Sequence, residues 1–241
     1  MASKKITVKD KTFDIVYDIV NLDKEKTIVF LHGWGSNKEV MKQAFKDDLK
    51  EYKHIYIDMP GFGKSINEEY ILTTDDYATI IKEFLNSLNI KPDIIAGHSF
   101  GGKVATLLNP PLLVLLSSAG IIETKSAKTL LTIRMAKIFN KFGLSKVTKL
   151  LRSKDVNMMS QNMYETFKNV VDEDFLPVFS KYEGKALLFW GEDDIATTLV
   201  SGKLMHNAIK NSKFYSYPSD HYFFLKYHKD ISNEILFNSE E

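Results

Sequence analysis

The sequence predicts an α/β fold in which a mostly parallel, eight-stranded sheet carries helices on both faces. Short apolar runs with the length of strands alternate with longer stretches of helical periodicity, and this alternation is typical of parallel sheets. Two of the runs, residues 27–31 and 112–116, are apolar almost throughout, as is expected of strands buried on both faces. The chain has 241 residues, of which 44% are hydrophobic, so it can form one domain with a sizeable core.

The expected elements follow in order along the chain. The first two β-like segments flank a polar turn and predict an opening hairpin. Strands are expected at residues 6–8, 12–17, 27–31, 54–57, 93–96, 112–116, 186–190 and 213–217. Helices are expected at residues 37–52, 77–88, 102–108 and 200–209, with a last helix from about residue 222. Ser36 and Glu39 have capping-box spacing at the start of the first helix, and residues 77–88 carry apolar side chains at helical spacing.

The alternation stops between residues 121 and 180, where only helical periodicity remains. Ligands bind beyond the carboxyl ends of the strands in open α/β sheets. We therefore expect residues 121–180 to form a helical cap, inserted into a single domain whose core consists of residues 1–120 and 181–241.

Composition excludes several classes of protein. Without Cys, the chain has no disulfide framework, thiol nucleophile or Cys-built metal site. The 32 Lys and Arg residues balance 31 Asp and Glu residues, so we expect no nucleic-acid partner. The longest purely apolar run, residues 112–116, is far shorter than the roughly 20 residues of a membrane span. No metal-binding His spacing is present, and we expect a cytoplasmic protein without metal or cofactor.

The strongest functional signal is the G-x-S-x-G sequence at residues 97–101. It follows a predicted buried strand and opens a predicted helix, which is the setting of a nucleophile elbow. In such a turn Ser99 is presented as a nucleophile, and the backbone amide of Phe100 points at the reacting carbonyl. An incidental serine in a glycine-rich turn is the alternative.

A serine nucleophile needs a histidine base and an acid that orients the base. Asp194 follows the predicted strand 186–190, and His221 follows the strand 213–217. Each could be an ordinary surface residue, but the chain order serine, acid, histidine favours a triad. Trp34, in the H-G-x-G turn after strand 27–31, could supply a second oxyanion-hole amide. We interpret His32 and His98 as structural, and residues 58–65 as a shaped loop, since they lack phosphate-loop spacing.

These motifs resemble the small capped members of the α/β-hydrolase superfamily over nearly the whole chain. The motifs are H-G-x-G at residues 32–35, D-x-P-G-F-G-x-S at 58–65, G-x-S-x-G-G at 97–102, G-x-x-D at 191–194, and a late His221. Residues 32–40 resemble pimeloyl-carrier-protein methyl ester esterases. Residues 152–174 resemble bacterial hydrolases often grouped with meta-cleavage-product hydrolases. The resemblance implies Ser99 as nucleophile, His221 as base, Asp194 as orienting acid, and the Trp34 and Phe100 amides as oxyanion hole.

The sequence departs from the family pattern near the acid and the base. Asp220 replaces the usual glycine before the late histidine, so Asp193 and Asp220 are rivals of Asp194 for the acid role. The H-G-x-G-P-G signature and the Trp after the catalytic histidine, both typical of carbon–carbon hydrolases, are missing.

The sequence therefore predicts a serine hydrolase that cleaves a carboxylic ester or thioester of a small molecule through an acyl-enzyme. The alternatives are a carbon–carbon bond hydrolase of the 2-hydroxy-6-oxo-dienoate type and a non-catalytic binding module on a hydrolase fold. The substrate pocket is expected to include Trp34, Met159, Met163 and Tyr222, although the two methionines could equally belong to the core.

The charge of the expected cap differs from that of the rest of the chain. Residues 121–155 contain nine basic and two acidic residues, a local charge of +7, which leaves −6 for the remainder of a chain with net charge +1. One interpretation is a solvated helical face. The other is a docking surface for an acidic acyl carrier protein that delivers a thioester-linked substrate.

Overall fold

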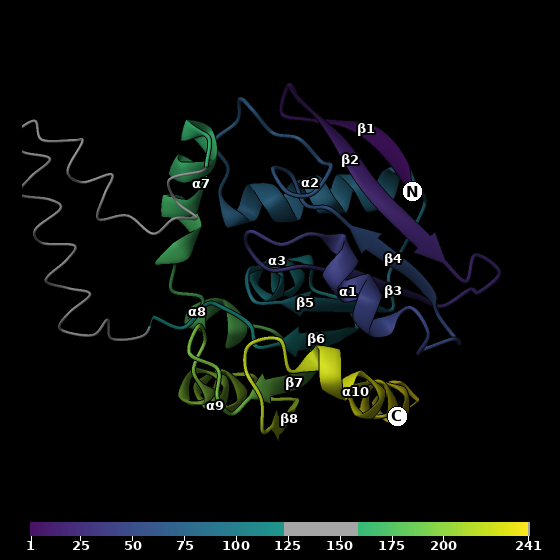
Figure 1. The fold of residues 1–241 in the computed structure, drawn as a ribbon, viewed down its shortest axis with the longest axis vertical. Helices are drawn as coiled ribbons and strands as arrows, with labels where there is room; N and C mark the ends of the chain where they lie inside the picture. Colours follow the sequence, from purple (N-terminus) through teal and green to yellow (C-terminus); the bar gives the residue numbers. More distant parts are fainter. Residues whose placement is uncertain (123–158, 241) are drawn as a thin grey trace, which may run out of the picture.

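A computed structural model describes residues 1–122 and 159–240 of the protein (Figure 1). Eight strands form one sheet in the order β1-β2-β4-β3-β5-β6-β7-β8. The strands are β1 (Ala2–Val8), β2 (Lys11–Val20), β3 (Thr27–Leu31), β4 (Lys53–Ile57), β5 (Ile94–His98), β6 (Leu112–Leu116), β7 (Lys185–Gly191) and β8 (Ser212–Tyr217). β1 and β2 pair antiparallel, β2 pairs antiparallel with β4, and the other neighbours are parallel. The predicted mostly parallel, eight-stranded sheet is confirmed.

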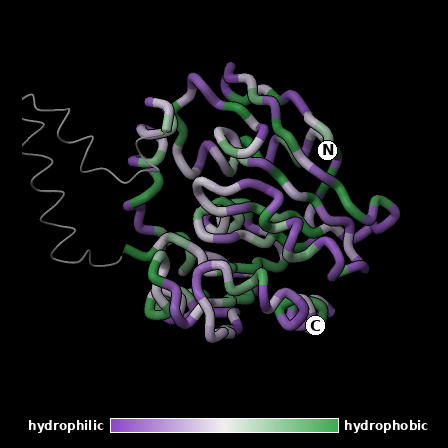
Figure 2. The backbone as a smooth tube through the Cα atoms, viewed as in Figure 1, coloured by the Kyte–Doolittle hydropathy of each residue, from purple (hydrophilic) through white to green (hydrophobic). Residues whose placement is uncertain are grey.

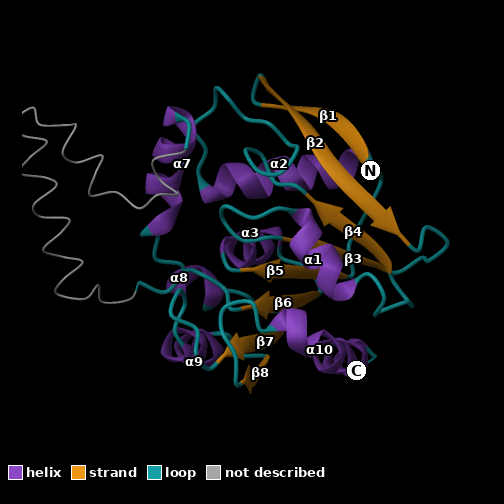
Figure 3. Ribbon diagram, in the orientation of Figure 1, coloured by secondary structure: helices purple, strands orange, loops and turns teal. Residues whose placement is uncertain are grey.

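Helices cover both faces of the sheet (Figure 3). In the described part of the chain they are α1 (Lys38–Phe45), α2 (Thr74–Ser87), α3 (Phe100–Leu108), α7 (Gln161–Val171), α8 (Leu176–Phe179), α9 (Leu199–Ala208) and α10 (Phe224–Ser239). None of these helices is both long enough and apolar enough to cross a membrane.

The alternation of side chains along β3 explains why two cores form. Ile28 and Phe30 point to one face, where they join a buried cluster with residues of α1 and α10. Val29 and Leu31 point to the other face and join a cluster with residues of α2, α3 and α9. Strands β3, β5 and β6 are buried along their whole length. Figure 2 shows hydrophobic residues, in green, along the central strands of the sheet.

The opening hairpin is longer than the sequence indicates, because it extends along both strands to Ala2 and Val20. Its two turn residues, Lys9 and Asp10, have φ angles of 48° and 64°. Two left-handed residues in a tight turn match the right-handed twist of the flanking strands, so the hairpin continues without a bulge.

The first helix differs from the prediction at both ends. Its N-cap is Asn37 rather than Ser36, since the Asn37 side chain accepts a hydrogen bond from the Glu39 amide at 3.0 Å. The helix ends at Phe45 instead of residue 52. Leu49 is buried with a φ of 47°, and the turn at this residue returns the chain to β4.

Part of the expected cap lies within the described residues. Helix α7 packs against the loop after β4, where Thr166 Oγ1 accepts from the Leu72 amide at 3.0 Å and Asn162 Nδ2 donates to the Asn67 carbonyl at 2.9 Å. The Phe175 amide donates to the Gly120 carbonyl at 2.8 Å. Residues 123–158, which include all nine basic residues of the stretch 121–155, lie outside the described residues, so the division into core and cap stays a prediction.

Candidate active site

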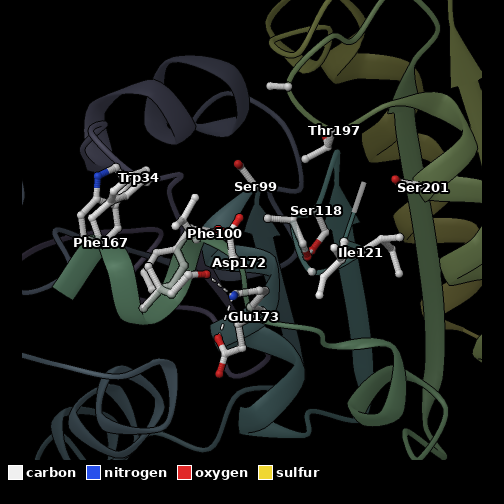
Figure 4. A pocket seen from close by; sticks show the side chains of 17 residues that line it. Trp34, Ser99, Phe100, Ser118, Ile121, Phe167, Asp172, Glu173, Thr197 and Ser201 are labelled. Atoms are coloured by element: carbon white, nitrogen blue, oxygen red, sulfur yellow. Dashed lines mark hydrogen bonds and ion pairs between the residues drawn. The ribbon is translucent and has the colours of Figure 1, made fainter. Parts of the chain in front are cut away.

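Ser99 lies in a sharp turn between β5 and α3. Its φ of 51° and ψ of −117° are strained for a residue other than glycine. A Cβ atom at Gly97 would collide with the Gly101 backbone, and one at Gly101 would collide with the carbonyl oxygens of Leu31 and His32. The glycines therefore allow α3 to start directly beneath the serine and to pack closely on β3. Ser99 is half-buried and lines a cavity (Figure 4).

Asp194 and His221 follow the neighbouring parallel strands β7 and β8, and this pairing brings the two side chains together. His221 Nδ1 donates a hydrogen bond to Asp194 Oδ2 at 2.7 Å. The hydrogen bond fixes the imidazole tautomer, so in the neutral ring Nε2 carries the lone pair that a general base needs.

Asp194 is buried and held by several donors besides His221. Its Oδ1 accepts from the amides of Ala196 at 2.8 Å and Thr197 at 3.0 Å, and its Oδ2 accepts from Thr197 Oγ1 at 3.0 Å. Burial by itself would raise the pKa of Asp194, but the hydrogen bonds from His221 and Thr197 outweigh it and lower the pKa to about 2. The carboxylate is therefore charged at neutral pH.

The other two acids do not share this environment. Asp193 and Asp220 are exposed, and Asp220 Oδ1 accepts from the Tyr222 amide at 2.9 Å. Among the three acids that the sequence leaves as candidates, Asp194 is the one hydrogen-bonded to His221.

Two buried histidines support the turns around Ser99. The His98 ring packs on the His221 ring with centroids 4.5 Å apart, and its Nε2 donates to the His221 carbonyl at 3.1 Å. Burial is the main reason that the pKa of His98 is well below its ordinary value. Burial likewise lowers the pKa of His32 to about 4, and its Nε2 accepts from the Met59 amide at 3.1 Å. Both rings are neutral at pH 7 and hold loops in place.

Trp34 and Phe100 lie near Ser99, in the segments that follow the adjacent strands β3 and β5. Phe100 is the first residue of α3, and Trp34 follows β3, which pairs with β5. A Cβ atom placed on Gly33 would lie 3.1 Å from Ser99 Cβ, so the turn before Trp34 contacts the serine. The Trp34 ring packs edge-on against Phe62 and Phe100, with centroids 4.8 Å and 5.6 Å apart.

Two cavities meet at Trp34. The first, of about 470 Å³, includes Ser99, Phe100, Lys103, Ser118, Phe167 and Glu173 in its lining. The second, of about 730 Å³, includes Met159, Met163 and Tyr222. The structure thus places the predicted pocket residues together, but in the cavity that Ser99 does not line. Met163 is buried and its sulfur contacts Gly61, so it belongs to the core as well as to the cavity wall.

Sequence reasoning missed most of the first cavity. A detectable signal was Lys103, a lysine on an otherwise largely apolar helix directly after the elbow. Within residues 1–122 and 159–240, no group of three or more His, Asp or Glu side chains is arranged to hold a metal ion.

Comparison with models of known protein families shows to which family the chain belongs. The model of the alpha/beta hydrolase family matches residues 28–225, which is most of the sequence. The chain belongs to the alpha/beta hydrolase family. It is accordingly a hydrolase of this family type, and the predicted superfamily is confirmed.

Relatives of this alpha/beta hydrolase include an uncharacterized hydrolase and an esterase. The uncharacterized hydrolase YugF of Bacillus subtilis is 27% identical over 234 residues, which cover 84% of this chain and 85% of the relative. A pimeloyl-[acyl-carrier protein] methyl ester esterase of Shewanella sp. (strain MR-7) is 38% identical over 79 residues, covering 33% of this chain and 27% of the relative.

Solved structures share the fold of this alpha/beta hydrolase. An esterase from Exiguobacterium antarcticum superposes with a TM-score of 0.77 at 20% identity, covering 100% of both chains. The enol-lactonase from Burkholderia xenovorans LB400 has a TM-score of 0.75 at 16% identity, covering 99% of this chain and 100% of the other. These similarities establish the fold.

Proposed function

We propose that the protein is a serine hydrolase that cleaves a carboxylic ester or thioester through an acyl-enzyme. The observation that carries the proposal is the hydrogen bond between buried Asp194 and His221, which follow β7 and β8 in the same sheet whose strand β5 leads into the strained turn of Ser99. A purely structural role requires neither a charged acid with an oriented imidazole nor a serine turn that lines a cavity at the same end of the sheet.

The proposed reaction proceeds in two steps. His221 Nε2 takes the Ser99 proton while Ser99 Oγ attacks the carbonyl carbon, and the Trp34 and Phe100 amides stabilise the oxyanion that forms. His221 then donates this proton to the departing alcohol or thiol, which leaves an acyl-enzyme. Water attacks the acyl-enzyme with the same base, and the acid product and free Ser99 are released. Asp194 stays ionised throughout and stabilises the imidazolium.

A fluorophosphonate probe tests the proposal directly. We expect the probe to add covalently to Ser99 in the wild-type protein, and intact-mass measurement should show no adduct with Ser99→Ala. The Ser99→Ala variant should also lose nearly all ester turnover. A folded wild-type protein that never reacts would instead support a non-catalytic binding module.

A panel of substrates separates the two hydrolytic reactions. 4-Nitrophenyl esters of increasing chain length report ester cleavage, and a 2-hydroxy-6-oxo-dienoate reports carbon–carbon cleavage by the same Ser99. We expect higher kcat/KM on the esters. Much faster consumption of the dienoate would favour the carbon–carbon hydrolase.

An acidic acyl carrier protein is a further part of the proposal. It is supported by the similarity of one third of the chain to the Shewanella esterase and by the charge of +7 on residues 121–155. Such a carrier would present its acyl chain as an ester or thioester to the cavity beside Ser99.

A further inference from the structure

The acyl part of the substrate can be assigned to one of the two cavities; this assignment rests on the proposed function. Ser99 lines the first cavity and not the second. Because the serine retains the acyl group through the intermediate, the acyl group occupies the first cavity. The second cavity, which Tyr222 lines beside His221, is left for the alcohol.

A buried lysine lies in the wall of the acyl cavity. Lys103 is on α3, one turn after the elbow, and is only 1% exposed. Its Nζ donates to the Val170 carbonyl at 2.6 Å and to Glu173 Oε2 at 2.7 Å. The ammonium also lies over the Phe175 ring, 4.7 Å from its centroid. The Lys103 ammonium is therefore stabilised by two hydrogen bonds and by a cation–π contact.

Glu173 is fixed in its position against Lys103. Its Oε2 accepts a second hydrogen bond, from Thr74 Oγ1 at 2.5 Å. Glu173 lines the same cavity as Ser99 (Figure 4). Burial lowers the pKa of Lys103, and the hydrogen bond and charge of Glu173 act against that effect. The Lys103–Glu173 pair is electrically neutral. The cavity therefore has a polar wall in which the Lys103 ammonium is already paired with Glu173.

We propose that Glu173 is a specificity-determining residue, which makes the acyl cavity accept uncharged acyl groups and reject those that end in a carboxylate. Asp172 also lines this cavity, and Lys103 is the one basic side chain among the described lining residues. A substrate carboxylate beside Glu173 would therefore find no free cation among these residues, and a charge removed from water without a partner is costly. An uncharged chain meets no such penalty and can pack against Trp34, Phe100 and Phe167.

The proposal predicts what removal of Glu173 does. In Glu173→Ala the Lys103 ammonium loses its partner, and space opens where the carboxylate was. The distal carboxylate of a half-ester can then take the place of the missing side chain. The same substitution therefore converts a repulsive position into an attractive one.

Matched substrate pairs test this proposal. Monomethyl esters of dicarboxylic acids, from succinic to suberic, are compared with the corresponding methyl esters that end in a carboxamide, because the two differ in charge but hardly in shape. The wild-type enzyme should prefer the carboxamide by about tenfold or more in kcat/KM at the best chain length. Glu173→Ala should shift this ratio by about tenfold or more toward the carboxylate, in line with the strength of charge-assisted hydrogen bonds.

Two further variants complete the experiment. Glu173→Gln removes the charge but keeps the volume, so it should improve half-ester turnover by a smaller factor than Glu173→Ala. Glu165→Ala, on α7 but outside the cavity lining, should leave the wild-type ratio unchanged. If Glu173→Ala does not fold, the wild-type preference and the Glu173→Gln ratio still decide the matter.

The outcomes separate this inference from the function on which it rests. Equal kcat/KM of the wild-type enzyme for both members of a pair would overturn the inference, as would a Glu173 variant that changes both substrates alike. In either case, continued turnover of the carboxamide esters and labelling of Ser99 would leave the serine hydrolase proposal standing. Loss of all ester turnover and labelling in the wild-type protein would contradict both.

Discussion

At the residue scale, burial separates Asp194 from acids that are almost its neighbours in sequence. Asp194 is 4% exposed and accepts hydrogen bonds from the turn that follows it, whereas Asp193 and Asp220 face solvent. Because an exposed carboxylate is stabilised by water in any orientation, it cannot fix the position of an imidazole. The hydrogen bonds of Asp194 restrict both the acid and His221 to one geometry.

Substitution of each acid in turn should show this difference. We expect Asp194→Asn to lower kcat by about four orders of magnitude, as the equivalent change does in serine triads, because an amide holds the wrong tautomer. Asp193→Asn and Asp220→Asn should keep kcat within about threefold of wild type, in keeping with their exposure. Steady-state kinetics on one ester decides the assignment, and a large loss with either control instead would transfer the acid role to that residue.

The sequence could single out Ser99 and His221 as candidates because each occupies a motif or a chain position that few other roles require. The motif pointed to Asp194 as the acid but left Asp193 and Asp220 as rivals, since hydrogen bonding across β7 and β8 depends on how the strands are aligned. The sequence could not place Lys103 and Glu173 together, because the two residues are 70 positions apart.

At the element scale, α3 is positioned by glycines rather than by side-chain packing alone. Gly101 lies against the carbonyl oxygens of Leu31 and His32, and this contact allows α3 to approach β3 closely. Most strand and helix positions were predictable from apolar runs and apolar periodicity, because strands β3, β5 and β6 are buried along their whole length and the helices pack one apolar face on the sheet. The end of α1 was not, since the turn at Leu49 depends on the path into β4 rather than on local propensity.

The Gly101→Ala substitution tests the close approach of α3 to β3. Alanine is the better helix former by about 1 kcal/mol, but its Cβ would collide with backbone that cannot move aside. We expect the free energy of unfolding to fall by about 3 kcal/mol, the upper part of the range for overpacking. Gly35→Ala is the matched control: its Cβ meets no atom within 4 Å, so it should cost only about 1 kcal/mol for the positive φ. Urea unfolding measures both, and equal losses would contradict the packing argument.

At the scale of the whole molecule, the sheet brings turns from distant parts of the chain together at the carboxyl ends of its parallel strands. The segments carrying Trp34, Ser99, Asp194 and His221 follow β3, β5, β7 and β8, whose parallel alignment puts their carboxyl ends together. This topology was predictable because alternating strands and helices permit few arrangements. The net charge of +7 on residues 121–155, against −6 on the rest of the chain, adds a charge asymmetry that concerns the molecule as a whole.

Salt dependence tests whether that asymmetry steers a carrier protein to the enzyme. If it does, kcat/KM for an ester on an acidic acyl carrier protein should fall by about tenfold between about 50 and 300 mM salt, because screening shortens the reach of charge. A small neutral ester should change by less than about twofold. Arg134 and Lys137 are two of the nine basic residues of this stretch and are three positions apart. The double variant Arg134→Glu with Lys137→Glu should reproduce the loss for the carrier-bound ester alone. Equal responses of both substrates would contradict carrier docking.

The hydrogen bond between the Phe175 amide and the Gly120 carbonyl has a consequence for how this family diversifies. The chain leaves the sheet after β6 and returns to the point from which it left, so the ends of the intervening stretch are pinned together. Doubling the length of such a closed stretch costs only about 0.6 kcal/mol of chain entropy. Insertions, deletions or exchange of this stretch can therefore accumulate over evolution while the turns that carry Ser99, Asp194 and His221 keep their positions.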